Sequence, residues 1–449
     1  MVRITLTRVV LAIAVVVVTY LLLKVDVASP TADAVCTVNE KPKTYRAASP
    51  IKQFSSSFGA HGVLGLAPDG TILSRQDVGG PSTNDIVAVE KGRRHALAIT
   101  KDATVLYWSQ DNSETRPEVD SRWPDMATAV NEVERGVFRI PPLADIVAIS
   151  AGGTHSLALT HQGDVWAWGA NDVGQLGRPS DAATSHITGK PPRLIQGLNG
   201  VVAVTAGERH SVALKRDGTV WQWGNDTYSH IDAKDMWIRG ERAKSLTNST
   251  PTQVEGLTEI VQIAAGSQFT MAIKADGTLW AWGSNSCGQL GRPAVWREER
   301  LSEIPALVHP QYEYQPIQVS GITDVVAVAA GSYHVIALTR DGRVWTWGSN
   351  QFGALGLDTH GRPSAGVCVG SDSRAFTPPP APYFSSPFAI ASLTDAVAVS
   401  AGSSNSFVIH RDGTLTGWGA CGDCLCNLAR PSAKPLEPLE VRRGKRGEE

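Results

Sequence analysis

Four histidines stand at one position of a recurring sequence pattern, and imidazoles at such a place could bind a metal or transfer protons. They are His95, His155, His210 and His334. Further copies of the pattern place Phe269, Asn405 and Gly62 at the same position. Since the pattern tolerates residues without an imidazole, we expect a structural role, in which each buried ring hydrogen-bonds to neighbouring backbone.

Three cysteines near the C-terminus form the pattern C-x-x-C-x-C, namely Cys421, Cys424 and Cys426. Three thiolates could hold zinc or a metal cluster, although the local set lacks a fourth ligand. The hydrophobic leader described below favours export to an oxidising compartment, where cysteines form disulfides. We therefore expect disulfides and no metal site. Cys36 is a candidate partner for one of the three, and Cys287 and Cys368 are candidates for each other.

The elements that must position these residues form a repeat. Residues 145–169 read DIVAISAGGTHSLALTHQGDVWAWG, and the same ungapped frame recurs five times. The recurrences are residues 85–109, 200–224, 259–283, 324–348 and 395–419. A degraded copy precedes them around residues 59–73, which gives seven repeats in all.

Each frame predicts three short strands. Two apolar runs, V-A-I-S and S-L-A-L-T in the quoted copy, are typical of strands buried on both faces. An Asp-Gly pair joins the second and third strands in most copies, as expected for a two-residue hairpin turn. Asp102-Ala103 lacks the glycine, so we expect strain there. The third strand places two Trp on one face as cross-blade packing elements: Trp166, Trp168, Trp221, Trp223, Trp280, Trp282, Trp345 and Trp347.

A small antiparallel sheet that recurs seven times buries its faces when the copies are arranged radially. The sequence therefore predicts an all-β fold, a seven-bladed β-propeller over residues 51–441. Segments that precede the frames, such as residues 192–198, 251–257 and 316–322, are expected to supply a fourth strand to each blade. Residues 438–441 are a candidate for closing the ring.

The N-terminal segment has the pattern of a targeting signal. Arg3 and Arg8 precede an apolar run from position 9 to position 23, and Lys24 follows it. This indicates an N-terminal hydrophobic helix at residues 1–34, either a cleaved signal peptide or a membrane anchor spanning about residues 4–24. The alternative is a buried N-terminal helix. The basic residues predict an N-in orientation, with the rest of the chain on the periplasmic or extracellular side. Residues 35–50 would be a linker and residues 442–449 a polar tail.

Composition limits the function. A formal net charge of −2 argues against a dedicated nucleic-acid binder, and 42% hydrophobic residues exclude global disorder. Neither a nucleotide-binding loop nor a catalytic triad can be recognised in the sequence, so we expect no cofactor and no enzymatic activity.

The frame at residues 151–177, repeated at 265–291 and 330–356, resembles the regulator of chromosome condensation repeat family. The resemblance implies a propeller. The founding members are nuclear, bind chromatin and act as guanine-nucleotide exchange factors for the small GTPase Ran. Other members are exported bacterial propellers, some of which inhibit β-lactamases with one propeller face. The leader and the near-neutral charge resemble the second group.

The connections after the third strands vary most and grow along the chain, so propeller symmetry places them on one side. They contain the three Trp outside the repeat, each near charged residues: Trp123, Trp237 with Arg239, and Trp296 with Arg297. Trp and Arg are frequent interface hot spots. Alternatively, these Trp pin long loops to the scaffold. We expect a non-enzymatic, exported and membrane-anchored propeller that binds a protein partner in the cell envelope or outside the cell. The alternative is an exchange factor for a small GTPase.

Overall fold

A computed structural model of the chain describes the following residues: 43–45, 53–56, 63–74, 80–81, 83–109, 131–134, 137–140, 143–180, 192–224, 248–294, 296–301, 304–310, 312–357, 366–368 and 381–420. The predicted leader, residues 1–34, and the polar tail, residues 442–449, lie outside these residues. Within them, no helix combines the length and the hydropathy that crossing a membrane requires.

The predicted strands of the frame form as antiparallel sheets. In the copy at residues 145–169 they are β10 (Ile146–Ala151), β11 (His155–Thr160) and β12 (Val165–Gly169). Every residue of β11 is buried, because this strand lies inside its sheet and between neighbouring sheets. The fourth strand, β13 (Arg193–Leu194), comes from the segment predicted to supply it and pairs with β12.

Six sheets contain four or five strands each. Besides the sheet just described, their strands are β5 (Ile86–Lys91), β6 (His95–Thr100), β7 (Val105–Ser109), β9 (Val137–Arg139) and β8 (Asn131–Glu134); β14 (Val201–Ala206), β15 (His210–Lys215), β16 (Val220–Gly224) and β17 (Asn248–Gln253); β18 (Ile260–Ala265), β19 (Phe269–Lys274), β20 (Leu279–Ser284) and β23 (Tyr312–Gln318); β24 (Val325–Ala330), β25 (His334–Thr339), β26 (Val344–Ser349), β28 (Ala381–Ala389) and β27 (Gly366–Cys368); and β29 (Ala396–Ala401), β30 (Asn405–His410), β31 (Leu415–Gly419) and β1 (Lys43–Tyr45).

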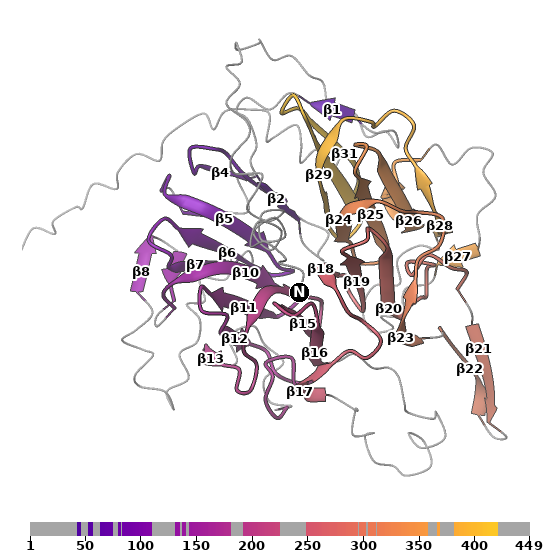
Figure 1. Ribbon diagram of the computed structural model, residues 1–449, viewed down its shortest axis with the longest axis horizontal. Coiled ribbons are helices and arrows are strands. Elements are labelled where there is room, and N and C mark those ends of the chain that lie inside the picture. Colours follow the sequence, from indigo (N-terminus) through magenta and orange to yellow (C-terminus); the bar gives the residue numbers. More distant parts are fainter. Residues whose placement is uncertain are drawn as a thin grey trace, which may run out of the picture.

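The propeller is confirmed, but seven equivalent blades are not. The structure has six full blades, while the degraded first repeat forms a smaller sheet of three strands, β2 (Gln53–Ser56), β3 (Val63–Leu66) and β4 (Ile72–Ser74). The innermost strands of successive sheets contact one another, and β2 contacts both β5 and β29, so this sheet completes the ring (Figure 1). Its copy of the frame has no Trp at either position of the third strand, whereas every full blade has a Trp at the second.

Ring closure differs from the expectation. The outer strand of the last blade is β1, which pairs with β31 through Thr44 and Thr416. Residues from before the first repeat therefore close the ring, whereas residues 438–441 lie outside the described chain. The segment 35–50, expected to be a linker, thus contains a blade strand. Figure 1 shows β1 beside β31, at the outer edge of the last sheet.

Four of the six full blades have the Trp pair, and in all six the Trp at the second position packs against the preceding sheet. Trp223 lies in a buried cluster with Leu157 and Leu159 of the blade before it, and Trp221 packs against the same cluster. The Trp223 Nε1 donates a hydrogen bond to the Gln175 carbonyl of that blade at 2.9 Å. Since a buried Trp side chain removes about 200 Å² of surface from water and also satisfies its N–H here, these residues hold the ring together.

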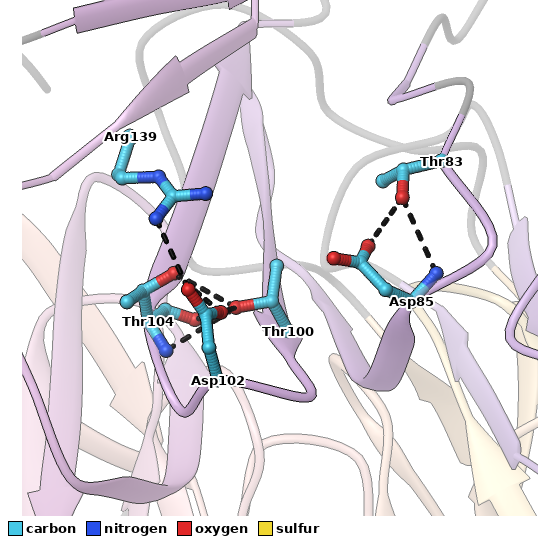
Figure 2. A network of polar contacts seen from close by, with 6 residues as sticks. All are labelled: Thr83, Asp85, Thr100, Asp102, Thr104 and Arg139. Carbon is cyan, nitrogen blue, oxygen red and sulfur yellow. Dashed lines mark hydrogen bonds and ion pairs between the residues drawn. The ribbon is translucent and has the colours of Figure 1, made fainter.

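The turn at Ala103 has the strain that the sequence predicts. Ala103 adopts a φ of +58°, a left-handed conformation that glycine takes in the equivalent turns. Figure 2 shows that the preceding Asp102 carboxylate accepts hydrogen bonds from Thr100 and Thr104 and pairs with Arg139. The hydrogen bonds from the two threonines and the nearby Arg139 charge lower the pKa of Asp102. This polar network fixes the turn in spite of the alanine.

Replacing Ala103 with glycine is expected to raise the free energy of unfolding by about 1 kcal/mol, because the left-handed conformation costs an L-residue about that much and glycine nothing. Urea denaturation of the two proteins measures the difference. Ala98→Gly, in the middle of β6, is the matched control and is expected to be destabilising. A loss of stability in Ala103→Gly would contradict the account.

Candidate functional site

The two sides of the ring are distinct because every blade is antiparallel. The turns between first and second strands and the connections between third and fourth strands lie on one side, here called the insertion side. The Asp-Gly turns between second and third strands and the links to the next blade lie on the other, the Asp-Gly side. The variable connections therefore do share one side of the propeller.

Some of these insertions build structure of their own. β21 (Trp296–Leu301) and β22 (Ile304–Pro310) form a separate hairpin, at the lower right of Figure 1. β27 adds a fifth strand to its blade by pairing with β28. Trp296 and Arg297 open β21 and pair with Pro310 and His309 across the hairpin. The other proposed partner-binding residues lie outside the described chain: Trp123, Trp237 and Arg239.

The four repeat histidines link adjacent blades. Each Nε2 lies within hydrogen-bond distance of a hydroxyl oxygen on the second strand of the next blade. The pairs are His95–Ser156 at 2.7 Å, His155–Ser211 at 2.9 Å, His210–Thr270 at 3.1 Å and His334–Ser406 at 2.9 Å. The partner of each Nε2 is thus a side-chain hydroxyl. The repeat shows why: a Ser or Thr follows the recurring position in the copy that receives the bond. The expected hydrogen bond to neighbouring backbone is present as well for two of the four, between His155 and the His210 backbone and between His334 and the Asn405 backbone.

Burial prevents these histidines from carrying a charge. Desolvation lowers the pKa of His95 and His155 to about 3 and that of His210 and His334 to about 4. The nearby Lys91 adds to the effect at His95. Among the described residues, no cluster of three or more His, Cys, Asp or Glu could hold a metal ion. In the described geometry these four histidines therefore have a packing role between blades.

Acid is expected to destabilise the propeller through these histidines. Below about pH 6.5 a histidine in the unfolded chain binds a proton that the buried ring cannot, so stability is retained above that pH and lost as the pH falls toward about 4. The loss is up to about 1.4 kcal/mol per pH unit for each histidine.

His155→Phe, which copies Phe269, tests this account by urea denaturation from pH 8 to pH 4. The variant is expected to be less stable by about 1 kcal/mol at pH 8, because Ser211 loses a partner. Its stability should fall less steeply between pH 6.5 and pH 4 than that of the parent. Equal slopes would contradict the pKa assignment.

A carboxylate, an imidazole and a hydroxyl line up in the last blade, which the sequence did not reveal. His410 Nδ1 lies 2.6 Å from Asp395 Oδ1, and its Nε2 lies 2.7 Å from Thr416 Oγ1. The order resembles a nucleophile relay. However, Thr416 is 1% exposed and sits on the strand that pairs with β1, so a substrate could not reach its hydroxyl. The arrangement ties the closing blade together.

The turn after the third strand is built alike in three blades. In each, an Asn side chain accepts a hydrogen bond from the backbone five residues later at 3.0 Å; the acceptors are Asn171, Asn285 and Asn350. Two residues after the Asn, Val173 is 5% exposed and Cys287 is fully buried. Cys287 is disulfide-bonded and packs with Tyr383 of the next blade.

Phe352 departs from this pattern. It occupies the position of Val173 and Cys287, yet it is 59% exposed and has a φ of +53°. The turn itself is fixed, because the Ala354 carbonyl accepts hydrogen bonds from Ser406 and Trp418 of the next blade. A phenyl ring held in water by a left-handed backbone opposes both the hydrophobic effect and backbone preference. Sequence reasoning missed it, because Phe352 reads as one more apolar residue of the repeat.

Charged side chains also meet on the insertion side, at the turns nearest the axis. Arg93 pairs with Glu208 at 2.7 Å, reaching across the blade between them, and Glu208 accepts a hydrogen bond from Ser267. Arg209 pairs with Asp172. Because the paired groups are partly exposed, these pairs add little stability. They give the insertion side a polar centre, with Phe352 on the turn of one blade.

The fold and the arrangement of its connections define a repeat propeller with a constant frame and one elaborated side. The chain belongs to the RCC1-like domain family, whose pattern matches residues 55–447. It is 29% identical to the human E3 ubiquitin-protein ligase HERC2 over 69% of this chain and 6% of that protein. It is 32% identical to the mouse secretion-regulating guanine nucleotide exchange factor over 61% of this chain and 56% of that protein. The chain thus spans a minor part of the first relative and about half of the second.

Solved structures agree on the fold. The yeast protein Prp20, solved in complex with Kap60, aligns with a TM-score of 0.57 and 19% identity over 82% of this chain and 80% of that one. Human WBSCR16 aligns with a TM-score of 0.55 and 18% identity over 83% of this chain and 87% of that one. All four of these relatives are eukaryotic, so they lend no support to the expected likeness to exported bacterial members.

Proposed function

We propose that this protein is a non-enzymatic scaffold that binds a protein partner through its insertion side. The observation that carries the proposal is Phe352, which stands in water where the equivalent residues of two other blades are buried. A strained, exposed aromatic residue on a rigid turn is what an interface anchor requires, because little conformational entropy is lost when it enters a pocket. We assign the partner a hydrophobic pocket that receives the phenyl ring.

The insertions would surround this anchor. Trp296 and Arg297 lie on the β21–β22 hairpin, and Trp123, Trp237 and Arg239 belong to other connections of the same side. The charged pairs near the axis, such as Arg93–Glu208, supply a polar region that favours correct partners over incorrect ones. RCC1-like relatives are consistent with a binding role. The yeast relative Prp20 binds Gsp1p and histones.

Export and membrane tethering remain part of the proposal. They are supported by the basic and apolar leader and by the disulfide at Cys287, since disulfides persist in oxidising compartments. Cys368 is the proposed partner of Cys287: Tyr383 packs on Cys287, and Tyr383 belongs to β28, where β27 pairs Cys368 with Ala381. The proposed location is the periplasmic or extracellular side.

Phe352→Gly separates binding from folding. Glycine accepts the left-handed φ, so the variant is expected to be as stable as the parent or more stable by about 1 kcal/mol. Crosslinking followed by quantitative mass spectrometry, in cells that make the protein, should show at least one crosslinked protein reduced tenfold or more. Leu194→Ala is the control, because Leu194 is 37% exposed on an outer strand. Capture unchanged by Phe352→Gly and by joint replacement of Trp123, Trp237 and Trp296 with Ala would refute the proposal.

A guanine-nucleotide exchange factor for a small GTPase is the second candidate, because one relative carries that name. An exchange factor needs its propeller in the cytosol or nucleus, whereas the proposed scaffold has its propeller on the periplasmic or extracellular side. A reporter active only outside the cytoplasm, fused after Glu449 with the leader intact, is expected to be active. Silence of this reporter, with activity of a cytosolic one and release of labelled GDP from a small GTPase, would favour the exchange factor.

A further inference from the structure

Two blades carry a cation over the first Trp of the third strand, on the Asp-Gly side. Lys215 Nζ lies 4.0 Å from the centre of the Trp221 ring, and Lys274 Nζ lies 5.8 Å from that of Trp280. In both blades the indole N–H donates to the threonine two residues earlier, at 3.2 Å. The ring thus offers its face to an ammonium group from its own blade, an electrostatic contact with the ring quadrupole.

The blade of β24–β28 has different residues at the positions of this lysine and this threonine. Thr339 stands at the position of Lys215 and Lys274, and Arg343 stands at the position of the indole-bonded threonines. The Trp345 N–H now bonds to Thr339 Oγ1 at 3.3 Å. Within the described part of the chain, no Lys or Arg lies over the Trp345 ring. This tryptophan keeps its N–H bond but lacks the ammonium that Trp221 and Trp280 have.

An open hollow of about 790 Å³ lies where that ammonium would be. Trp345, Thr339 and Ile322 line it together with the acidic residues Asp324 and Asp341. Thr339 donates a hydrogen bond to Asp341 at 2.6 Å, which lowers the pKa of this carboxyl and keeps it charged at neutral pH. The wall therefore combines an aromatic ring with two acidic and two basic residues.

Two arginines also line the hollow, and they do not exclude a cation. Arg343 pairs with Asp341 at 3.3 Å. Arg340 has the same repeat position as Arg216, and Arg216 coexists with the ammonium of Lys215 over Trp221. An arginine at the position of Arg340 is therefore compatible with an ammonium group over the Trp ring, as the blade of Trp221 shows.

We propose that the hollow over Trp345 binds a primary ammonium group, supplied by a lysine side chain of another protein or by a free alkylamine. The ligand takes the place that Lys215 and Lys274 occupy in the neighbouring blades, between the indole face and the carboxylates of Asp324 and Asp341. The site lies on the Asp-Gly side and does not depend on the partner surface around Phe352.

The test uses the full chain labelled with 5-fluorotryptophan, with ¹⁹F signals assigned by single Trp→Phe variants. Titration with Nα-acetyl-lysine methylamide is expected to shift the Trp345 signal with a dissociation constant on the order of millimolar, since a partly exposed contact of this kind is weak. The signals of Trp221 and Trp280 should stay in place because their sites are filled. The uncharged analogue, acetylated on both nitrogens, should shift none of the three.

Thr339→Lys gives the blade its own ammonium and should weaken binding at least tenfold. Thr339→Val is the matched control, because it removes the same hydroxyl and adds no charge, and it should retain binding. Conversely, Lys215→Thr should create a second responding signal at Trp221. Butylamine binding as tightly as a lysine-containing octapeptide would identify a free amine as the ligand, and a tenfold tighter peptide would identify a protein lysine.

Three results would overturn the assignment. These are an equal shift with the uncharged analogue, unchanged binding in Thr339→Lys, and a response of Trp345 to acetate in place of the amine. The last result would assign the hollow to anions through Arg340 and Arg343.

Discussion

The close approach of successive blades around the axis is the constraint on which the rest of the structure depends. At Gly152 an added Cβ would lie 2.6 Å from the Gly207 carbonyl of the next blade and 2.6 Å from the His155 ring. No other residue fits there, and the repeat accordingly has Gly at this position in each full frame. This contact brings the imidazole within reach of the next blade's hydroxyl, as His155 and Ser211 illustrate. Each blade thus completes the hydrogen bonds and the packing of another.

Such mutual dependence makes the frame rigid and leaves the connections free to vary. The second strands, such as β11, are buried along their whole length, so almost any change in them creates a cavity or strain. The connections between third and fourth strands meet no such requirement. They differ in length, and one of them contains the β21–β22 hairpin. Variation on a fixed scaffold is how loop-borne binding sites arise, and here topology confines it to one side.

Because the blades repeat one frame, equivalent positions in different blades can be compared. A Phe at the place of Val173 and Cys287 turns outward, and a Thr at the place of Lys215 and Lys274 leaves an indole face uncovered. Neither residue is unusual by type. Their meaning comes from the contrast with equivalent positions whose geometry is otherwise the same, down to the 3.0 Å bonds accepted by Asn285 and Asn350. Differences between equivalent positions of the blades are therefore what distinguishes this protein from a scaffold of identical repeats.

Much of the fold followed from the sequence by itself, because hydrophobic pattern and turn chemistry are local. The strands of the frame, the Asp-Gly turns, the source of the fourth strand and the strain at Ala103 could be read from it. The sequence could not decide how the ring closes, since the pairing of β1 with β31 joins opposite ends of the described chain. It also could not show that the first repeat is a smaller sheet, or which hydroxyl each histidine meets. The exposure of Phe352 and the hollow at Trp345 depend on backbone conformation and on neighbouring blades. Only the tertiary structure decides these, because they arise between residues that the sequence keeps far apart.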